Sequence, residues 1–304
     1  MGLPGFEYER RSIGDAEYSV ARGGSGPAAL LLHGFPETHA CWHAIAPRLA
    51  ATHRVIAPDL KGYGASEAPP GGTHGEGYSK REMAAELAEL MTALGHERFA
   101  VVGHDRGARV AYRLALDHPD RVTHTAILNV VPTVDQFERM GAGPSLGYWP
   151  WFLLAQPAPF PEQVLVASRE TLLDHAFTTW ATNPDAIAPE SRGAYLAAVT
   201  ESTAATMCAD FRASFHIDRQ EEAEDRAAGR RIAPPVLLVI GEDEEQLADA
   251  PEIWRSWADD LASHTVPGGH FIPEEAPDEL LEVLVPFLLR TDPDRNAHYG
   301  GDRD

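Results

Sequence analysis

Short apolar runs alternate with segments of helical character along most of the chain, and this alternation limits the possible folds more than any other feature. The apolar runs fall at residues 29–34, 54–60, 99–103, 122–131 and 233–243. Strands that alternate with helices form a parallel sheet with helices on both faces. Two earlier strands are predicted at 6–14 and 16–24, and a last one near 263–268. The sequence therefore predicts an α/β protein with a mostly parallel, eight-stranded sheet.

The alternation stops between residues 132 and 232. This stretch begins with aromatic residues and prolines, as in "SLGYWPWFLLAQPAPFPEQ", and then becomes helical and charged. Ligand sites of open α/β sheets lie at the carboxyl ends of the strands. We therefore expect a core built from 1–131 and 233–290, a helical cap over the strand ends built from 132–232, and a polar tail at 291–304.

The pentapeptide "GHDRG", Gly103 to Gly107, lies between a predicted strand and a predicted helix. A glycine at each end allows the sharp turn that lifts a nucleophilic side chain above the sheet. The N–H groups and the dipole at a helix N-terminus favour negative charge, so Asp105 is expected to stay ionised. The alternative is that Asp105 only caps the helix, which is a common function of aspartate.

Two further motifs follow other predicted strands. "HGFP" at 33–36 follows the third strand, where the backbone N–H of Phe35 can join that of Arg106 in an oxyanion hole. "GGHF" at 268–271 follows the last strand and offers His270 as a general base. We predict Asp105 as the nucleophile and His270 as the base.

The charge and the cysteine content disfavour several classes of function. The net charge of −21 opposes binding to nucleic acid or to anionic membranes. Cys41 and Cys208 are the only cysteines, which predicts neither a disulfide framework nor a zinc cluster. The first residues lack the apolar segment of a signal peptide, and no apolar run is long enough to span a membrane. We expect a cytoplasmic protein without metal or cofactor.

These motifs resemble the α/β-hydrolase superfamily, and within it the branch with an aspartate nucleophile, which includes haloalkane and haloacetate dehalogenases and epoxide hydrolases. The stretches "GHDRGARVAYRLALDHPDRV" and "WFLLAQPAPFPE" are most similar to the haloacetate (fluoroacetate) dehalogenases. The resemblance implies that Asp105 displaces halide from carbon and that water activated by His270 hydrolyses the resulting ester. It also implies that Arg106 and Arg109 hold the carboxylate of a small anionic substrate, and that the protein is a homodimer.

The acid that supports the base departs from the family pattern. In the family it follows the sixth strand, where this chain has Asn129. An amide can accept a hydrogen bond from the imidazole but cannot stabilise an imidazolium by charge. Some relatives place the acid after the seventh strand, where "GEDEE" offers Asp243 and Glu244 as alternatives.

The halide pocket implied by the resemblance is altered as well. Trp151 matches a family halide donor, whereas the family's histidine and tyrosine positions hold Pro150 and Phe211. Tyr148 and Trp149, in the same aromatic stretch, are assigned to the substrate pocket. Fluoride needs strong hydrogen-bond donors as it leaves carbon, whereas chloride and bromide leave more easily. The sequence therefore predicts a preference for chloro- and bromoacids.

Two other functions remain open from the sequence. An epoxide hydrolase would use the same Asp105 and His270, with Tyr148 or Tyr195 as the acid that protonates the epoxide oxygen. The arginine pair argues against a neutral epoxide. The altered positions Asn129, Pro150 and Phe211 would also fit a non-catalytic binding protein on a hydrolase scaffold.

Overall fold

The computed structural model describes residues 2–141 and 144–290, so the predicted tail at 291–304 lies outside the described residues. An eight-stranded sheet forms the centre, in the order β1-β2-β4-β3-β5-β6-β7-β8. β2 is antiparallel to β1 and β4, and the other neighbours are parallel. The strands are β1 (Glu7–Ile13), β2 (Ala16–Gly24), β3 (Ala28–Leu32), β4 (Arg54–Pro58), β5 (Phe99–His104), β6 (Val122–Leu128), β7 (Val236–Gly241) and β8 (Leu261–Val266). The predicted α/β fold with a mostly parallel, eight-stranded sheet is confirmed.

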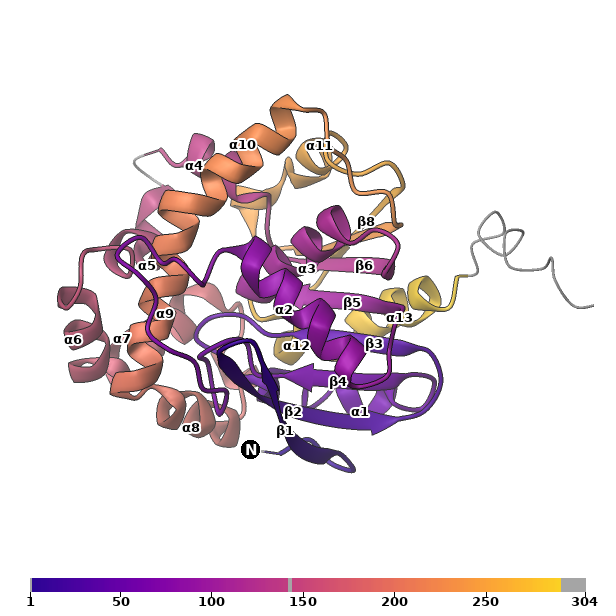
Figure 1. Cartoon of the computed structure of the whole chain (residues 1–304), viewed down its shortest axis with the longest axis horizontal. Coiled ribbons are helices and arrows are strands. Elements are labelled where there is room, and N and C mark those ends of the chain that lie inside the picture. The colour runs from indigo at the N-terminus through magenta and orange to yellow at the C-terminus, as the bar shows by residue number, and fades with distance from the viewer. Residues whose placement is uncertain (1, 142–143, 291–304) are drawn as a thin grey trace, which may run out of the picture.

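Helices cover both faces of this sheet. The core helices are α1 (Ala46–Leu49), α2 (Lys80–Ala93), α3 (Arg106–Asp117), α11 (Ala250–Trp254), α12 (Ile272–Glu275) and α13 (Pro277–Leu288). Figure 1 shows α2 and α3 in front of the sheet and α1 and α13 behind it. The central strands β3, β5 and β7 are buried along their whole length. A strand covered on both faces needs a continuous apolar run, which explains "AALLL" and "VLLVIG".

Between β6 and β7 the described chain is mainly helical, within the segment predicted as the cap. Its helices are α4 (Thr133–Arg139), α5 (Trp149–Leu153), α6 (Phe160–Ala167), α7 (Arg169–Trp180), α8 (Pro189–Ala198), α9 (Glu201–Ala213) and α10 (Arg219–Ala227). In Figure 1, α5 to α9 gather on the side of the sheet where the parallel strands end. They therefore cover the edge at which α/β proteins bind ligands.

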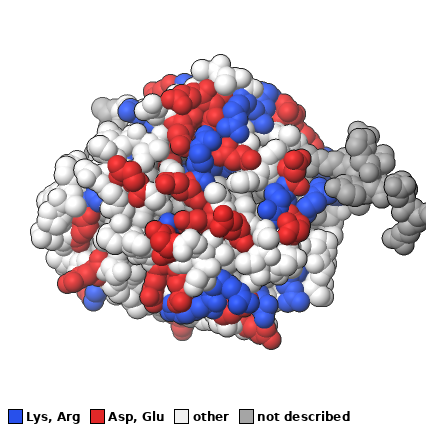
Figure 2. Space-filling model, in the orientation of Figure 1, with Lys and Arg blue, Asp and Glu red and all other residues white. Residues whose placement is uncertain are grey.

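The surface carries charges of both signs. On the face drawn in Figure 2, red carboxylates are interspersed with blue lysines and arginines. Among the described residues, no helix is long and apolar enough to cross a membrane.

Candidate active site

Asp105 lies at the turn between β5 and α3. Its φ of 47° and ψ of −112° are values that non-glycine residues rarely adopt. A Cβ on Gly103 would collide with the Gly107 carbonyl, and a Cβ on Gly107 would collide with the Leu32 carbonyl of β3. Both glycines are thus needed for α3 to pack this closely behind Asp105. The Asp105 side chain makes no capping hydrogen bond to α3, so it does not serve as the helix cap considered above.

The backbone holds one oxygen of the Asp105 carboxylate. The Phe35 N–H donates to Oδ1 at 2.8 Å, so the "HGFP" loop brings one predicted oxyanion donor to this atom. The second, the Arg106 N–H, stays a prediction. Burial acts to raise the pKa of Asp105, but the charges of His270 and Arg106 outweigh it and hold this pKa below its ordinary value. The nucleophile candidate is therefore ionised at neutral pH.

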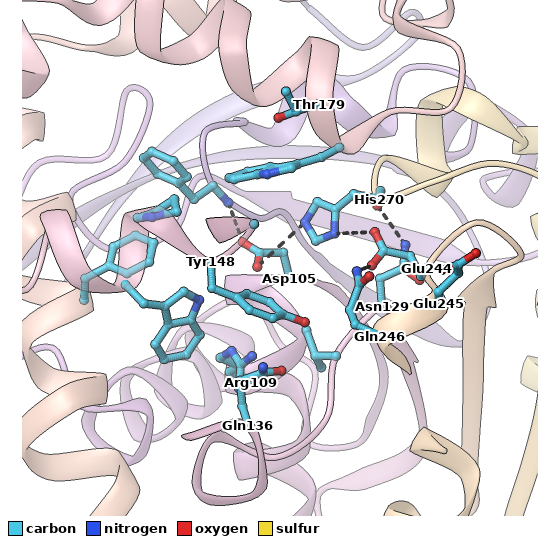
Figure 3. Close-up of a pocket in the computed structure, with 17 residues that line it drawn as sticks. Asp105, Arg109, Asn129, Gln136, Tyr148, Thr179, Glu244, Glu245, Gln246 and His270 are labelled. Carbon is cyan, nitrogen blue, oxygen red and sulfur yellow. Dashed lines mark hydrogen bonds and ion pairs between the residues drawn. The ribbon is translucent and has the colours of Figure 1, made fainter. Parts of the chain in front are cut away.

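His270 lies between two carboxylates (Figure 3). Its Nε2 is 3.9 Å from Asp105 Oδ2, and its Nδ1 is 3.4 Å from Glu244 Oε1. Burial lowers the pKa of His270, but the hydrogen bond and charge of Glu244 and the charge of Asp105 outweigh it and raise the pKa to about 9. The imidazole is therefore protonated at neutral pH while Asp105 carries its charge.

Glu244, rather than its neighbour Asp243, is the acid beside His270. It follows β7 and is buried. The Asp243 carboxylate instead accepts a hydrogen bond from Thr182 Oγ1 at 2.6 Å. Of the two acids that the sequence offered, only Glu244 lies beside His270, because the two side chains leave the loop in different directions.

Among the described residues, Asn129 makes no hydrogen bond to the imidazole of His270. Its Nδ2 donates to the backbone oxygens of Gly269 and His270, at 2.9 Å each. Its Oδ1 accepts from the Gly241 N–H at 2.9 Å. The expectation that Asn129 might stand in for the acid is therefore corrected. Its amide ties the loop that carries His270 to the end of β7.

Arg106 has a partner other than the one predicted. Its Nε donates to Asp210 Oδ2 at 2.7 Å, and its Nη2 donates to Asp210 Oδ1 at 3.0 Å and to Ser214 Oγ at 2.7 Å. Asp210, on α9, also accepts from Lys80. Asp210 takes up the Nε and Nη2 groups of the guanidinium, while Nη1 has no hydrogen-bond partner among the described residues, so the expectation that Arg106 holds the substrate carboxylate stays a prediction. Arg106 therefore links the core to the helices above it.

Arg109 lies one helical turn further along α3 and lines the cavity above Asp105. Its Nη1 donates to Val131 O and Thr133 Oγ1, at 3.1 Å each. Its Nε has no hydrogen-bond partner among the described residues. Within the same part of the chain, no carboxylate lies at ion-pair distance from Arg109. A buried cation without a counter-ion is costly, so this site favours an anionic ligand.

The cavity has a volume of about 540 Å³ and also reaches Asp105, Glu244 and His270. The predicted Phe35, Tyr148, Pro150, Trp151 and Phe211 all line it. The rings of Phe35, Trp151 and Phe211 form edge-to-face pairs with Phe211 in the middle, with centroids 5.3 and 5.9 Å apart. They form a continuous aromatic wall.

Two predicted aromatic residues lie elsewhere. Trp149 packs against the rings of His175 and Trp180, outside the cavity lining. Tyr195 is buried, and its hydroxyl donates to Glu274 at 3.0 Å. Tyr195 is therefore unavailable to an epoxide oxygen in this cavity. Among the described residues, no cluster of His, Cys, Asp and Glu is arranged to hold a metal ion.

Several residues of the site were missed from the sequence. Gln136 and Trp180 line the cavity. The Trp180 ring packs edge-to-face against the His270 ring, with the ring centroids 5.5 Å apart. Asp210, on α9, pairs with Arg106. In the sequence, the segments that carry Gln136, Trp180 and Asp210 show only helical character. No local motif indicates that a polar residue on a helix faces a distant arginine. "CADFRAS" did place Asp210 beside the pocket residue Phe211, which is the one available signal.

The chain is similar to several known proteins over most of its length. The family model of the alpha/beta hydrolase fold matches residues 27–277. A fluoroacetate dehalogenase of Burkholderia sp. is 38% identical, with 93% of this chain and 94% of that protein covered. A soluble epoxide hydrolase of Corynebacterium sp. (strain C12) is 29% identical, with 87% and 91% covered. A Pseudomonas aeruginosa structure described as that of a candidate epoxide hydrolase is 42% identical, with 95% and 97% covered and a TM-score of 0.88.

Proposed function

Since this chain belongs to the α/β-hydrolase family, we propose that it is a hydrolytic dehalogenase of 2-haloacids that works through an ester of Asp105. The comparisons support a hydrolase and include both dehalogenases and epoxide hydrolases. The observation that carries the choice of haloacids is Arg109, which lines the cavity of Asp105 and His270 and is buried without an ion-pair partner among the described residues. A substrate carboxylate would supply the missing negative charge.

In the first step, Asp105 attacks the carbon that bears the halogen. Its Oδ2 is the oxygen free to react, because Oδ1 accepts from the Phe35 N–H. A bond forms between Oδ2 and carbon while the carbon–halogen bond breaks, and the halide leaves with the electron pair. The product of this step is an alkyl ester of Asp105, with Oδ1 as its carbonyl oxygen.

In the second step, water hydrolyses this ester. Esterification removes the charge of Asp105, one of the groups that raise the pKa of His270, so the imidazole loses its proton more easily. Neutral His270 takes a proton from water, whose oxygen attacks the ester carbonyl carbon. Collapse breaks the bond to the alkoxide, which takes the proton from His270 and leaves as the 2-hydroxy acid. The Asp105 carboxyl gives its remaining proton to His270, which restores the imidazolium, and the proton that His270 lost to solvent before hydrolysis balances the released halide.

The walls of the cavity support chloride or bromide as the leaving group. Pro150 and Phe211 offer no hydrogen-bond donor from their side chains, and Trp151 offers a single indole N–H. Fluoride, which binds protons and donors most strongly, depends on such donors more than the larger halides do. We propose the order bromide, chloride, fluoride for the rate of the first step.

Epoxide hydrolysis is the second candidate, and Tyr148 is the observation that favours it. Tyr148 lines the cavity and makes a side-chain hydrogen bond with Gln136. Burial, together with the charge of Glu244, raises the pKa of Tyr148 to about 12. Its phenol could donate to an epoxide oxygen. A neutral epoxide, however, would leave Arg109 without a counter-ion. A non-catalytic binding protein is disfavoured by the ordered series of Asp105, His270 and Glu244.

Halide release from fluoro-, chloro- and bromoacetate, with styrene oxide as the competing substrate, tests the proposal. Replacement of Arg109 by Lys keeps the charge but loses the planar fork, so kcat/KM for bromoacetate should fall by ~10²-fold. Arg192→Lys, on α8 outside the cavity, is the matched control. His270→Ala should accumulate a bromoacetate-derived adduct on the peptide that holds Asp105, seen by mass spectrometry. Diol formation from styrene oxide without halide release from any haloacid would replace the proposal with the epoxide alternative.

A further inference from the structure

The cavity above Asp105 is far larger than a two-carbon acid requires. A volume of about 540 Å³ falls in the range of pockets, on the order of 300–1,000 Å³, that enclose drug-sized ligands. A haloacetate has only two carbons, a carboxylate and a halogen. Bound at Arg109 with its reacting carbon at Asp105, it would leave most of the cavity to water.

The cavity combines polar groups with an aromatic wall, and the guanidinium carbon of Arg109 lies 4.6 Å from the centroid of the Trp151 ring. Arg109 and Gln136 lie together at one end, and Glu244 and His270 lie on one side (Figure 3). The aromatic wall of Phe35, Trp151 and Phe211 lines the cavity beside Arg109. Water against such a wall is unfavourable, whereas an apolar group that displaces it gains about 25 cal/mol per Å² of buried apolar area.

From this geometry we infer that the preferred substrate is a haloacetate whose halogen-bearing carbon also carries an aryl group. The inference rests on the proposed function for the reacting centre and adds the substituent. The carboxylate would pair with Arg109 and the carbon would face Asp105. The aryl ring would fill the aromatic part of the cavity in edge-to-face or offset contact with its rings, the geometries that aromatic pairs prefer.

The reaction follows the same two steps, and the reacting carbon carries an additional aryl group. Oδ2 of Asp105 displaces halide from the benzylic carbon, and hydrolysis of the ester releases the 2-aryl-2-hydroxy acid. The aryl group also stabilises the reacting carbon electronically, so a higher kcat alone would not report a fitted pocket. Binding of the unreactive acids separates the two effects.

The first experiment compares chloroacetate with 2-chloro-2-phenylacetate in halide release, and acetate with phenylacetate in binding by calorimetry. We expect kcat/KM at least tenfold higher for the phenyl substrate, and phenylacetate to bind at least tenfold tighter than acetate. Equal or weaker binding of phenylacetate would overturn the inference and leave the dehalogenase proposal standing. Tight binding of phenylacetate without halide release from either substrate would uphold the large aromatic pocket and overturn the dehalogenase.

A pair of neighbouring substitutions tests the same point in the protein. Thr179 lines the cavity from α7 (Figure 3), whereas Thr178, which is also exposed, does not. Thr179→Trp should lower the ratio of kcat/KM for the phenyl substrate over chloroacetate by about tenfold, because the indole takes up cavity volume. Thr178→Trp should leave this ratio within twofold of the wild type. A ratio that both substitutions change equally would contradict the inference.

Discussion

At the scale of single residues, the position of Glu244 beside His270 favours it over Asp243 as the carboxylate that would support the base. We predict that Glu244→Gln lowers kcat by about 10²–10⁴-fold, because the amide cannot balance the imidazolium that forms during water attack. Asp243→Asn should stay within twofold of the wild type, since its carboxylate bonds Thr182. Pre-steady-state kinetics should show a full burst of halide in Glu244→Gln followed by slow turnover. The reverse pattern in the two variants would contradict the assignment.

The charge state of His270 gives a pH dependence at the same scale. Its pKa is raised to about 9, so the folded state binds a proton that the unfolded chain, with an ordinary pKa of 6.5, binds less tightly. The stabilisation is complete below pH 6.5 and is lost as the pH rises through 9. Titration followed by NMR should give a pKa near 9 for the wild type and a lower value for Asp105→Asn. An unchanged pKa in that variant would contradict the coupling between the two groups.

At the scale of elements, the ion pair between Arg106 and Asp210 connects α3 to α9. Asp210→Asn leaves Arg106 buried without its ion-pair partner and Lys80 with Asp218 alone, so we predict a loss of about 3–5 kcal/mol in the free energy of unfolding. The control is Asp174→Asn, whose carboxylate is exposed and pairs with Arg192 at 3.4 Å. That variant should lose less than about 1 kcal/mol. Urea denaturation measures both, and similar losses would show that the buried pair adds little.

Other features of the elements were predictable because they depend on neighbours in sequence. The strand-to-helix turn at Asp105 was recognisable from "GHDRG", since Gly103 and Gly107 meet backbone that no Cβ could approach. The buried strands were recognisable from apolar runs. The helices of α4 to α10 were predicted as helical, but the residues they turn toward the cavity, such as Gln136 and Trp180, were not.

At the scale of the whole molecule, the net charge of −21 opposes the approach of an anionic substrate. We predict that kcat/KM for a haloacid anion rises by about twofold between 10 and 150 mM of a non-halide salt, because the long-range repulsion is screened. The kcat should stay constant, since Arg109 is buried and screened much less. Stopped-flow halide release measures both values, and a fall in kcat/KM with salt would contradict the prediction. The homodimer stays a prediction, which sedimentation equilibrium can test.

The sequence by itself determined the sheet, the helical insertion and the positions of Asp105 and His270, because each rests on periodicity or on a motif of a few adjacent residues. The tertiary structure decided which of two arginines lines the cavity and which of two adjacent acids lies beside His270. Arg106 and Arg109 lie one turn apart on α3, but the partner of Arg106, Asp210, is 104 residues away in sequence. Asp243 and Glu244 differ only in the direction in which their side chains leave the loop. Such choices depend on which distant side chain arrives nearby, and no local pattern encodes that.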